Sequence, residues 1–296
     1  MNIYKYFRIC PSYKNLLQGC FLHYRLITSF TSTLNRLQTQ HVSNMSSAKP
    51  KVLVTRIDIP QKALDKLKEK CDVEIYPVAL PIPRDELLKR IQGKNGLFCL
   101  ITEKIDKELL DAAGPSLKVV STFSVGYDHI DLDEVKARKI KVGYTPGVPT
   151  DASAELTVAL LLTAGRRLFE ANAELLNGGW GKCAWSPLWM TGWGLANSTV
   201  GIFGLGRIGL GVLQRLKGFN VARFIYNSRS KKKEGEDLGA EFVSFDTLLT
   251  QSDFVVITAA LTDDTRDVFN AEAFAKMKSS AILVNTARGG IVDKDV

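Results

Sequence analysis

The sequence predicts an α/β protein that contains two doubly wound parallel sheets. After residue 50, short apolar runs rich in β-forming residues alternate with helical runs along the chain. In the second half, a glycine-rich turn follows one of these apolar runs and opens a helix. The 296 residues are also enough for two domains. Because repeated βα units place helices on both faces of a sheet, we expect the strands to be parallel.

The first domain is predicted over residues 51–150. Apolar runs such as KVLVT and GLFCLIT predict strands, and runs with apolar residues at helical spacing, such as QKALDKLKEK, predict helices. Gly93 is expected to end one of these helices. The expected strands are 51–55, 72–77, 96–102, 117–123 and 140–146, and the expected helices are 61–70, 84–93, 106–114 and 131–139.

The second domain is predicted over residues 151–296. The Pro/Gly-rich stretch TPGVPTD separates the domains, and one continuous helix over 151–179 is expected to follow it. Asp151 and Ser153 are cap candidates for this helix, and Gly178 with Gly179 would end it. Its first half is so apolar that we expect it to be buried between domains or subunits. The expected strands are 198–204, 222–227, 253–258 and 281–286.

Residues 1–50 are predicted to be a disordered or targeting leader. They carry six of the eight net positive charges and no acidic residue, so the folded body offers no basic face for nucleic acid or a membrane. Abundant Arg, Ser and Thr are typical of a mitochondrial presequence, and untranslated sequence misread as coding is an alternative. Initiation at Met45 would instead give a cytoplasmic form. Both compartments therefore stay open.

The five cysteines are odd in number and lack C-x-x-C spacing. They predict neither a disulfide framework nor a zinc site, and we expect no metal. The longest apolar stretch, around 156–165, is too short to cross a bilayer. We therefore expect a soluble protein from a reducing compartment.

The turn GIFGLGRIG carries the strongest functional signal. Gly204, Gly206 and Gly209 form G-x-G-x-x-G between an apolar strand and a helix, and a second strand follows within about 30 residues. The first glycine permits a tight turn, the second lets the backbone approach a pyrophosphate, and the third allows helix–strand packing. The helix N-terminus then presents N–H groups to the phosphates. This order predicts a Rossmann dinucleotide-binding domain.

The end of the next strand predicts the cofactor. An NAD site usually has Asp or Glu there, to accept a hydrogen bond from the ribose 2′-OH. This chain has no carboxylate at that place, and Arg229 could bind a 2′-phosphate with both arms of its guanidinium. We therefore predict NADP(H) over NAD(H). The corresponding residues are Asn227, Ser228, Arg229, Ser230, Lys231 and Lys232.

Several collinear motifs together resemble the D-isomer-specific 2-hydroxyacid dehydrogenase family, and most closely its glyoxylate/hydroxypyruvate reductase branch. The motifs are STFSVGYDHIDLDEVKARKIKVGYTPGV, SAELTVALLLTAGRR, GIFGLGRIG and MKSSAILVNTARGGIVD. The resemblance covers essentially all of 51–296. It implies a flavodoxin-like substrate domain before the Rossmann domain, and NADPH-dependent reduction of glyoxylate to glycolate and of hydroxypyruvate to D-glycerate.

The resemblance also implies site residues. The backbone amides of Val125 and Gly126 would hold the substrate carboxylate. Arg288 would orient the substrate and stabilise the negative charge that develops on its carbonyl oxygen. The segment Leu205, Gly206, Arg207 and Ile208 would cover the pyrophosphate, and Ala260 and Thr286 would contact the nicotinamide half of the cofactor.

The family resemblance further implies a homodimer. The apolar helix suits the subunit interface, and a tryptophan before the fingerprint can shape the partner's pocket. Trp185, Trp189 and Trp193 are the candidates, and spacing does not choose among them.

The family also uses a His with a Glu partner as proton donor, and both are expected after Val296. The sequence contains only His23, His41 and His129, and we expect His129 to be a packing or surface residue. The chain is thus expected to be a C-terminally truncated fragment, gene-model error or splice form.

Three alternatives to the reductase stay open. One is an inactive NADP-binding remnant. Another is a related dehydrogenase such as 3-phosphoglycerate dehydrogenase, which normally has an acidic residue near Asn227. The third is a non-enzymatic, dinucleotide-sensing interaction protein of the same fold, like the C-terminal-binding-protein corepressors.

Overall fold

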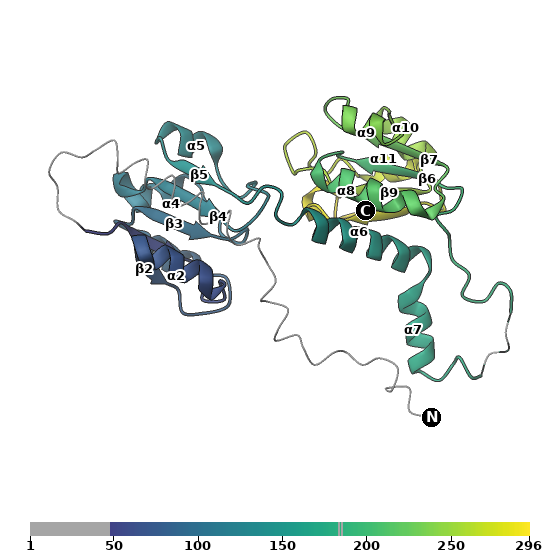
Figure 1. Ribbon diagram of the computed structural model, residues 1–296, viewed down its shortest axis with the longest axis horizontal. Coiled ribbons are helices and arrows are strands. Elements are labelled where there is room, and N and C mark those ends of the chain that lie inside the picture. Colours follow the sequence, from purple (N-terminus) through teal and green to yellow (C-terminus); the bar gives the residue numbers. More distant parts are fainter. Residues whose placement is uncertain (1–47, 183, 185) are drawn as a thin grey trace. The chain divides into compact units, whose positions relative to one another are not determined.

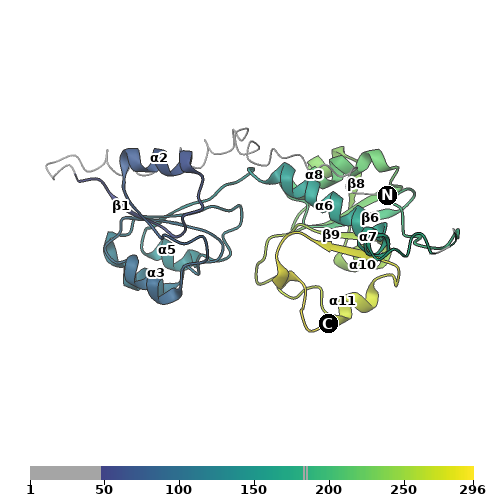
Figure 2. The ribbon, with the colours of Figure 1, turned by 90° about the horizontal axis from the view of Figure 1, so that it is seen from below.

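The computed structural model describes residues 48–182, 184 and 186–296, and these form two compact units that divide between Val148 and Pro149. Each unit is a five-stranded parallel sheet with helices on both faces (Figures 1 and 2), which confirms the predicted fold class. The targeting prediction for residues 1–50, including Met45, falls almost wholly outside the described residues, and so does the prediction for Trp185.

The first sheet has the strand order β2-β1-β3-β4-β5, the order of flavodoxin-like folds. All strands and helices predicted for this half are present; the helix over 61–70 has the predicted bounds, and the others are shorter by one to four residues. The strands are β1 (Lys51–Val54), β2 (Asp72–Ile75), β3 (Gly96–Cys99), β4 (Val119–Thr122) and β5 (Lys141–Gly143), and the helices are α2 (Gln61–Lys70), α3 (Arg84–Arg90), α4 (Lys107–Ala113) and α5 (Leu132–Ala137).

Two hydrophobic layers cover this sheet. Alternation along β1 sends Val52 and Val54 to the layer that contains Leu64 of α2, whereas Leu53 enters the layer of α3, α4 and α5. Figure 2 shows α2 on one face and α3 with α5 on the other. Because both faces are covered, β3 is buried along its whole length.

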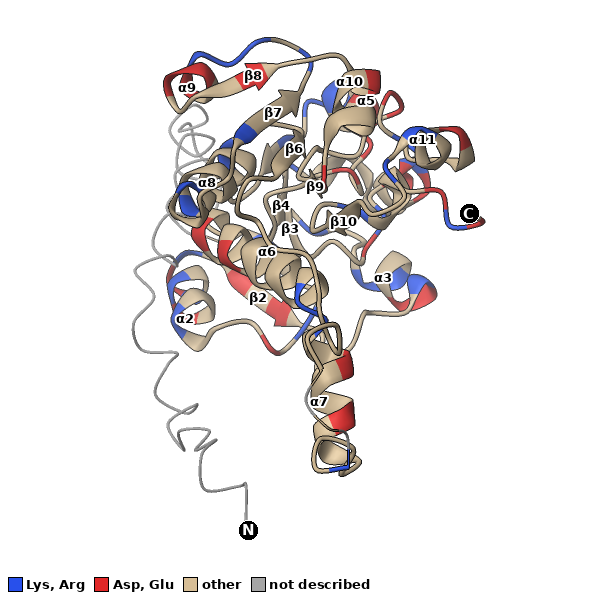
Figure 3. Ribbon diagram, turned by 90° about the vertical axis from the view of Figure 1, so that its right-hand side faces the viewer, with Lys and Arg blue, Asp and Glu red and all other residues tan. Residues whose placement is uncertain are grey.

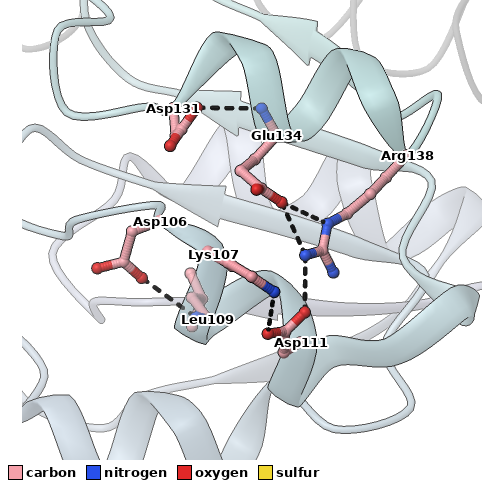
Figure 4. A network of polar contacts seen from close by, with 7 residues as sticks. All are labelled: Asp106, Lys107, Leu109, Asp111, Asp131, Glu134 and Arg138. Atoms are coloured by element: carbon pink, nitrogen blue, oxygen red, sulfur yellow. Dashed lines mark hydrogen bonds and ion pairs between the residues drawn. The ribbon is translucent and has the colours of Figure 1, made fainter.

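Aspartates start two of these helices. Asp106 accepts a hydrogen bond from the Leu109 N–H at 3.2 Å and caps α4, and Asp131 accepts from the Glu134 N–H at 3.0 Å and caps α5. The two helices are joined by Arg138, whose Nη2 lies 2.7 Å from Asp111 Oδ1 (Figure 4). The two aspartate caps fix where each helix begins, and the Arg138–Asp111 pair holds the helices together.

The second sheet has the order β10-β9-β6-β7-β8. The chain order therefore reverses between β6 and β9, as in a Rossmann fold. All four strands predicted for this half are present, as β6 (Thr199–Phe203), β7 (Arg223–Asn227), β9 (Phe254–Ile257) and β10 (Ile282–Asn285). The remaining elements are β8 (Ala240–Phe242) and the helices α6 (Thr150–Gly165), α7 (Leu168–Leu176), α8 (Arg207–Leu216), α9 (Lys233–Asp237), α10 (Phe245–Gln251) and α11 (Ala271–Lys276).

The prediction of one continuous helix over 151–179 is wrong. The chain breaks between α6 and α7, where Arg167 has a left-handed φ of 54°. The Gly165 carbonyl accepts a hydrogen bond from the Trp193 N–H at 2.7 Å, and a Cβ on Gly192 would lie 2.1 Å from the same oxygen. A later segment of the chain thus occupies the place where the next helical turn would continue.

The start of α6 also differs from the prediction. Neither Asp151 nor Ser153 caps it, because the helix begins at Thr150 after Pro149. Asp151 instead accepts a hydrogen bond from Arg215 of α8 at 2.9 Å. Ala154 and Leu161 of α6 are fully buried in the same hydrophobic cluster as α8 residues, so this helix belongs to the core of the second unit.

Further features concern only the described part of the chain. None of its helices is both long and apolar enough to cross a membrane. It contains no group of three or more His, Cys, Asp or Glu side chains that could hold a metal ion. Cys71 and Cys99 are buried free thiols.

Asp106 gives a test of how the first unit is stabilised. Burial raises the pKa of its carboxyl, but hydrogen bonds from Arg84 and the Leu109 N–H outweigh burial, so the pKa is lowered. We expect Asp106→Ala to lower the free energy of unfolding by about 1 kcal/mol at pH 7. A lowered folded pKa means that this stabilisation is present above the unfolded pKa of about 4 and is lost as pH falls through the folded value.

Urea unfolding of wild type and variant at pH 7 and near pH 2.5 measures this difference. Asp106→Asn is the matched control, because it keeps an oxygen acceptor for the cap and removes only the charge. A difference that is as large in acid as at neutral pH would contradict the assignment.

Candidate functional site

The glycine fingerprint lies at the point where the strand order of the second sheet reverses. Gly204 follows β6, and the residues after β9 lie beside it. In open parallel sheets, this switch point is the place where ligands bind, beyond the carboxyl ends of the strands. The fold therefore brings the strongest sequence motif to the position where a site is expected.

Gly204 is required there for two reasons. Its φ is +93°, a conformation that disfavours residues with a Cβ. A Cβ at this position would lie 2.4 Å from the Ala259 Cα and 2.5 Å from its nitrogen, both backbone atoms that have little freedom to move. The Thr258 hydroxyl also donates a hydrogen bond to the Gly204 carbonyl at 2.7 Å. Residues after β9 thus lock the turn after β6.

Gly209 and Gly206 have different surroundings. A Cβ on Gly209 would lie 2.8 Å from the Gly204 oxygen, so Gly209 allows α8 to pack against the turn. A Cβ on Gly206, by contrast, would meet no protein atom within 4 Å. Gly206 therefore faces open space beside the N-terminus of α8, where a ligand backbone could approach.

The first turn of α8 offers hydrogen-bond donors to that space. The amides of Arg207 and Ile208 donate to no atom of the described residues. Such amides, aligned at the positive end of a helix, bind phosphate. The turn can therefore hold the pyrophosphate of a dinucleotide, as the fingerprint predicts.

The basic loop after β7 lies next along the same edge of the sheet. Its Lys and Arg residues are blue between β7 and α9 in Figure 3. Arg229 is exposed and makes no hydrogen bond or ion pair with any described residue, whereas Lys231 lies 3.7 Å from Glu236. Asn227 donates its side-chain amide to the Val243 carbonyl at 2.9 Å, so one face of that side chain is used within the fold.

Ser228, Ser230 and Lys232 complete the loop. The Ser228 hydroxyl donates to the Ser230 carbonyl at 2.7 Å, which curls the loop back on itself. Lys232 is half-buried, and its backbone bonds to the Tyr226 hydroxyl. The six residues from 227 to 232 therefore include two exposed cationic side chains, Arg229 and Lys231, and no carboxylate.

Ala260 and Thr286 follow β9 and β10 respectively. The Ala260 carbonyl accepts a hydrogen bond from the Thr265 hydroxyl at 2.7 Å. The Thr286 hydroxyl lies 2.7 Å from that of Thr157 in α6. Both residues lie at the carboxyl edge of the sheet that also carries the fingerprint.

Arg288 lies just beyond β10, before a short 3-10 helix at Gly289–Ile291. Asn285 holds the backbone on both sides of Ala287. Its side-chain oxygen accepts from the Ala287 N–H at 3.0 Å, and its amide donates to the Arg288 carbonyl at 2.8 Å. The sequence does not single out Asn285, although it is a polar residue at the end of an apolar strand.

In the first unit, the loop after β4 contains the two backbone amides that are predicted to donate hydrogen bonds to the substrate carboxylate. The Ser124 hydroxyl donates to the Gly126 carbonyl at 2.6 Å, and the Ser124 carbonyl accepts from the Thr145 N–H at 2.8 Å. The amides of Val125 and Gly126 donate to no atom of the described residues. Two adjacent free N–H groups in a fixed loop suit a carboxylate.

A buried carboxylate that the sequence did not reveal lies at the switch point of the first sheet. Glu103 follows β3 and is 3% exposed. It accepts hydrogen bonds from the Thr55 hydroxyl at 2.9 Å and the Leu100 N–H at 2.7 Å. These partners satisfy the carboxylate, and through them Glu103 joins the end of β1 to the loop that follows β3.

His129 and the described tryptophans differ in how deeply their side chains are buried. The two ring nitrogens of His129 are buried, and its carbonyl accepts from the Ile105 N–H at 2.8 Å. Trp189 is half-buried against Trp180, with ring centroids 5.0 Å apart, whereas Trp193 is 62% exposed.

Comparisons with known proteins agree with this geometry. The family model for the D-isomer specific 2-hydroxyacid dehydrogenase, NAD binding domain, matches residues 158–296. The human protein named glyoxylate reductase/hydroxypyruvate reductase is 50% identical over 248 residues, which cover 83% of this chain and 75% of that protein. The mouse protein of the same name is 51% identical over 226 residues, which cover 76% of this chain and 68% of that protein.

The fold also matches solved structures. The crystal structure of the TT0316 protein from Thermus thermophilus has a TM-score of 0.75 and 42% identity, and the match covers 83% of this chain and 76% of that one. The family match supports the assignment of a nicotinamide dinucleotide-binding domain to the second unit.

Gly206 and Gly218 provide a matched test of the fingerprint. A Cβ added to either would meet no protein atom within 4 Å, and neither has a left-handed φ. We therefore expect Gly206→Ala and Gly218→Ala to keep the free energy of unfolding within about 0.5 kcal/mol of wild type. Only Gly206→Ala should weaken dinucleotide binding, by about tenfold or more, because its methyl group would occupy the space for the pyrophosphate.

Isothermal titration with NADPH and with NADH, together with urea unfolding, separates the two effects. Equal dinucleotide affinity in the two variants would show that the space beside Gly206 is not the phosphate site.

Proposed function

This chain belongs to the D-isomer specific 2-hydroxyacid dehydrogenase family, and we propose that it is an NADPH-dependent reductase of small 2-oxo acids that converts glyoxylate to glycolate and hydroxypyruvate to D-glycerate. The locked glycine turn at the switch point, with unpartnered amides at its helix, carries the proposal. The relatives at 50% and 51% identity, both named glyoxylate reductase/hydroxypyruvate reductase, support the choice of substrates.

The basic loop supports the preference for NADP(H). A 2′-phosphate adds negative charge beside the adenosine ribose, and a carboxylate at that position would repel it. Residues 227–232 contain no carboxylate, and the exposed guanidinium of Arg229 has no competing ion pair among the described residues. Arg229 is therefore the residue that we assign to the 2′-phosphate, as a bidentate donor.

The residues fit the chemistry of carbonyl reduction. Bound NADPH supplies the hydride that adds to the carbonyl carbon of the 2-oxo acid. We assign the substrate carboxylate to the Val125 and Gly126 amides, whose N–H groups point to no atom of the described residues. We assign Arg288 to the carbonyl oxygen, where its positive charge stabilises the alkoxide that develops during reduction. That oxygen then takes a proton from a donor that we do not assign among the described residues.

We also propose a homodimer. Large apolar side chains on and after α7 are exposed, including Phe169 at 75%, Leu176 at 74% and Leu188 at 83%. Exposed apolar surface of this kind marks an interface. Sedimentation equilibrium of the chain measures the oligomeric state, and a monomer at micromolar concentration would rule this proposal out.

Arg229 tests the cofactor preference. We expect Arg229→Gln to raise the Kd for NADPH by about tenfold to a hundredfold and to leave the Kd for NADH nearly unchanged, because only NADPH carries the 2′-phosphate. Lys231→Gln is the matched control, since Lys231 already lies near Glu236. Titration of both dinucleotides measures the ratio, and an unchanged ratio in Arg229→Gln would refute the assignment.

Arg288 tests the reaction. NADPH oxidation, followed by absorbance with glyoxylate and with hydroxypyruvate, measures activity. We expect Arg288→Lys to lower kcat by about a hundredfold or more and to raise KM, because Lys keeps the charge but loses the two-armed geometry. NADPH affinity should stay unchanged. Wild-type protein that oxidises NADPH with neither substrate would reject the proposed reaction itself.

A further inference from the structure

We propose that Tyr226 is a positioning residue that holds the basic loop (Ser228–Lys232) in the shape that selects NADPH. This inference rests on the proposed function, because it concerns how that cofactor is recognised. Tyr226 lies in β7, before the loop, and its side chain is fully buried. Neither the fingerprint nor the family motifs quoted above draw attention to it.

The Tyr226 hydroxyl closes the loop. It accepts a hydrogen bond from the Lys232 N–H at 2.8 Å and donates to the Lys232 carbonyl at 3.3 Å. One side chain at the start of the loop therefore holds both polar backbone groups of the residue at its end. The intervening residues must turn within that fixed span.

A second contact ties the same end of the loop to the pyrophosphate turn. Gly235, in the middle of α9, is buried although its neighbours are exposed. A Cβ on Gly235 would lie 2.3 Å from Leu205 Cδ2 and 3.4 Å from Tyr226 Cε1. Its φ is not left-handed, so close packing, and not backbone conformation, explains the glycine. Leu205 belongs to the fingerprint, so Tyr226 and Gly235 connect the two phosphate-binding segments.

The cationic side chains depend on this support. Arg229 makes no hydrogen bond or ion pair with a described residue, so its guanidinium is restrained only through the loop backbone that carries it. At its other end, the loop is held where the Gly204 N–H donates to the Asn227 carbonyl at 2.8 Å. Loss of the Tyr226 hydroxyl would free the far end and spread Arg229 over more positions, which lowers the affinity for a 2′-phosphate.

A purely structural role would have a different effect. A buried tyrosine hydroxyl usually needs a partner, and its loss commonly lowers stability. That loss alone would weaken the binding of NADPH and NADH equally, because both need the folded unit. A positioning role instead predicts a change in the ratio of the two affinities.

The test compares Tyr226→Phe with two other variants in the full chain. Tyr226→Phe keeps the ring and removes the hydroxyl. Arg229→Gln removes the assigned phosphate ligand. Asn270→Ala removes the side chain that accepts from the Ala273 N–H and caps α11, so it lowers stability away from the basic loop.

We expect Tyr226→Phe to raise the Kd for NADPH by about fivefold and to change the Kd for NADH by less than about twofold. The amide of Lys232 should also exchange its hydrogen faster. Asn270→Ala should leave the affinity ratio unchanged. If Tyr226→Phe does not fold, Gly235→Ala, which presses a methyl group against Leu205, replaces it with the same expectation for the ratio.

The outcomes separate the two proposals. Wild-type protein without a preference for NADPH refutes the proposed cofactor choice. A wild-type preference that Arg229→Gln lowers and Tyr226→Phe leaves unchanged overturns the role of Tyr226 alone. A lower preference in both variants, with Asn270→Ala unaffected, supports it.

Discussion

The close approach of Gly204 to Ala259 determines the geometry of the second unit. Two backbone segments, one after β6 and one after β9, meet where a single methyl group would prevent contact. The Thr258 hydroxyl then bonds to the Gly204 carbonyl, and Gly209 packs α8 against it. The position of α8, and hence of its free amides, depends on this contact. The direction in which the α8 amides point is therefore set by the steric constraint at Gly204.

Much of this could be predicted from the sequence, because the signals are local. Apolar runs such as 51–55 and 253–258 form strands as expected, and the glycine fingerprint correctly predicts a turn followed by a helix. The break within 151–179 could not be predicted in this way. It depends on Gly192 and Trp193, which reach the Gly165 carbonyl from a segment 27 and 28 residues further along the chain. Helical propensity depends only on the local sequence, so it cannot predict a contact with a distant segment.

The candidate site shows the same division at the level of single residues. The sequence singles out residues with distinctive chemistry, such as Arg288 and Arg229, as site candidates, whereas it does not single out the residues that hold them. Each holder is an ordinary polar side chain that bonds to main-chain atoms nearby, and its importance arises only once the loop is folded. The holders and the residues they fix are Thr258 with Gly204, Asn285 with Arg288, Ser124 with Gly126, and Tyr226 with Lys232.

This arrangement separates the requirements of binding from those of folding. The guanidinium of Arg229 makes no contact that holds the loop, so we expect changes there to alter the proposed NADPH recognition at little cost in stability. A holder such as Asn285 or Tyr226 makes bonds that shape the backbone, so its loss affects both properties. Cofactor preference can therefore change through the exposed residues of a loop while its buried anchors stay the same. For that reason, the identity of an exposed side chain indicates which ligand is selected, and the buried hydrogen bonds indicate how firmly the loop is held.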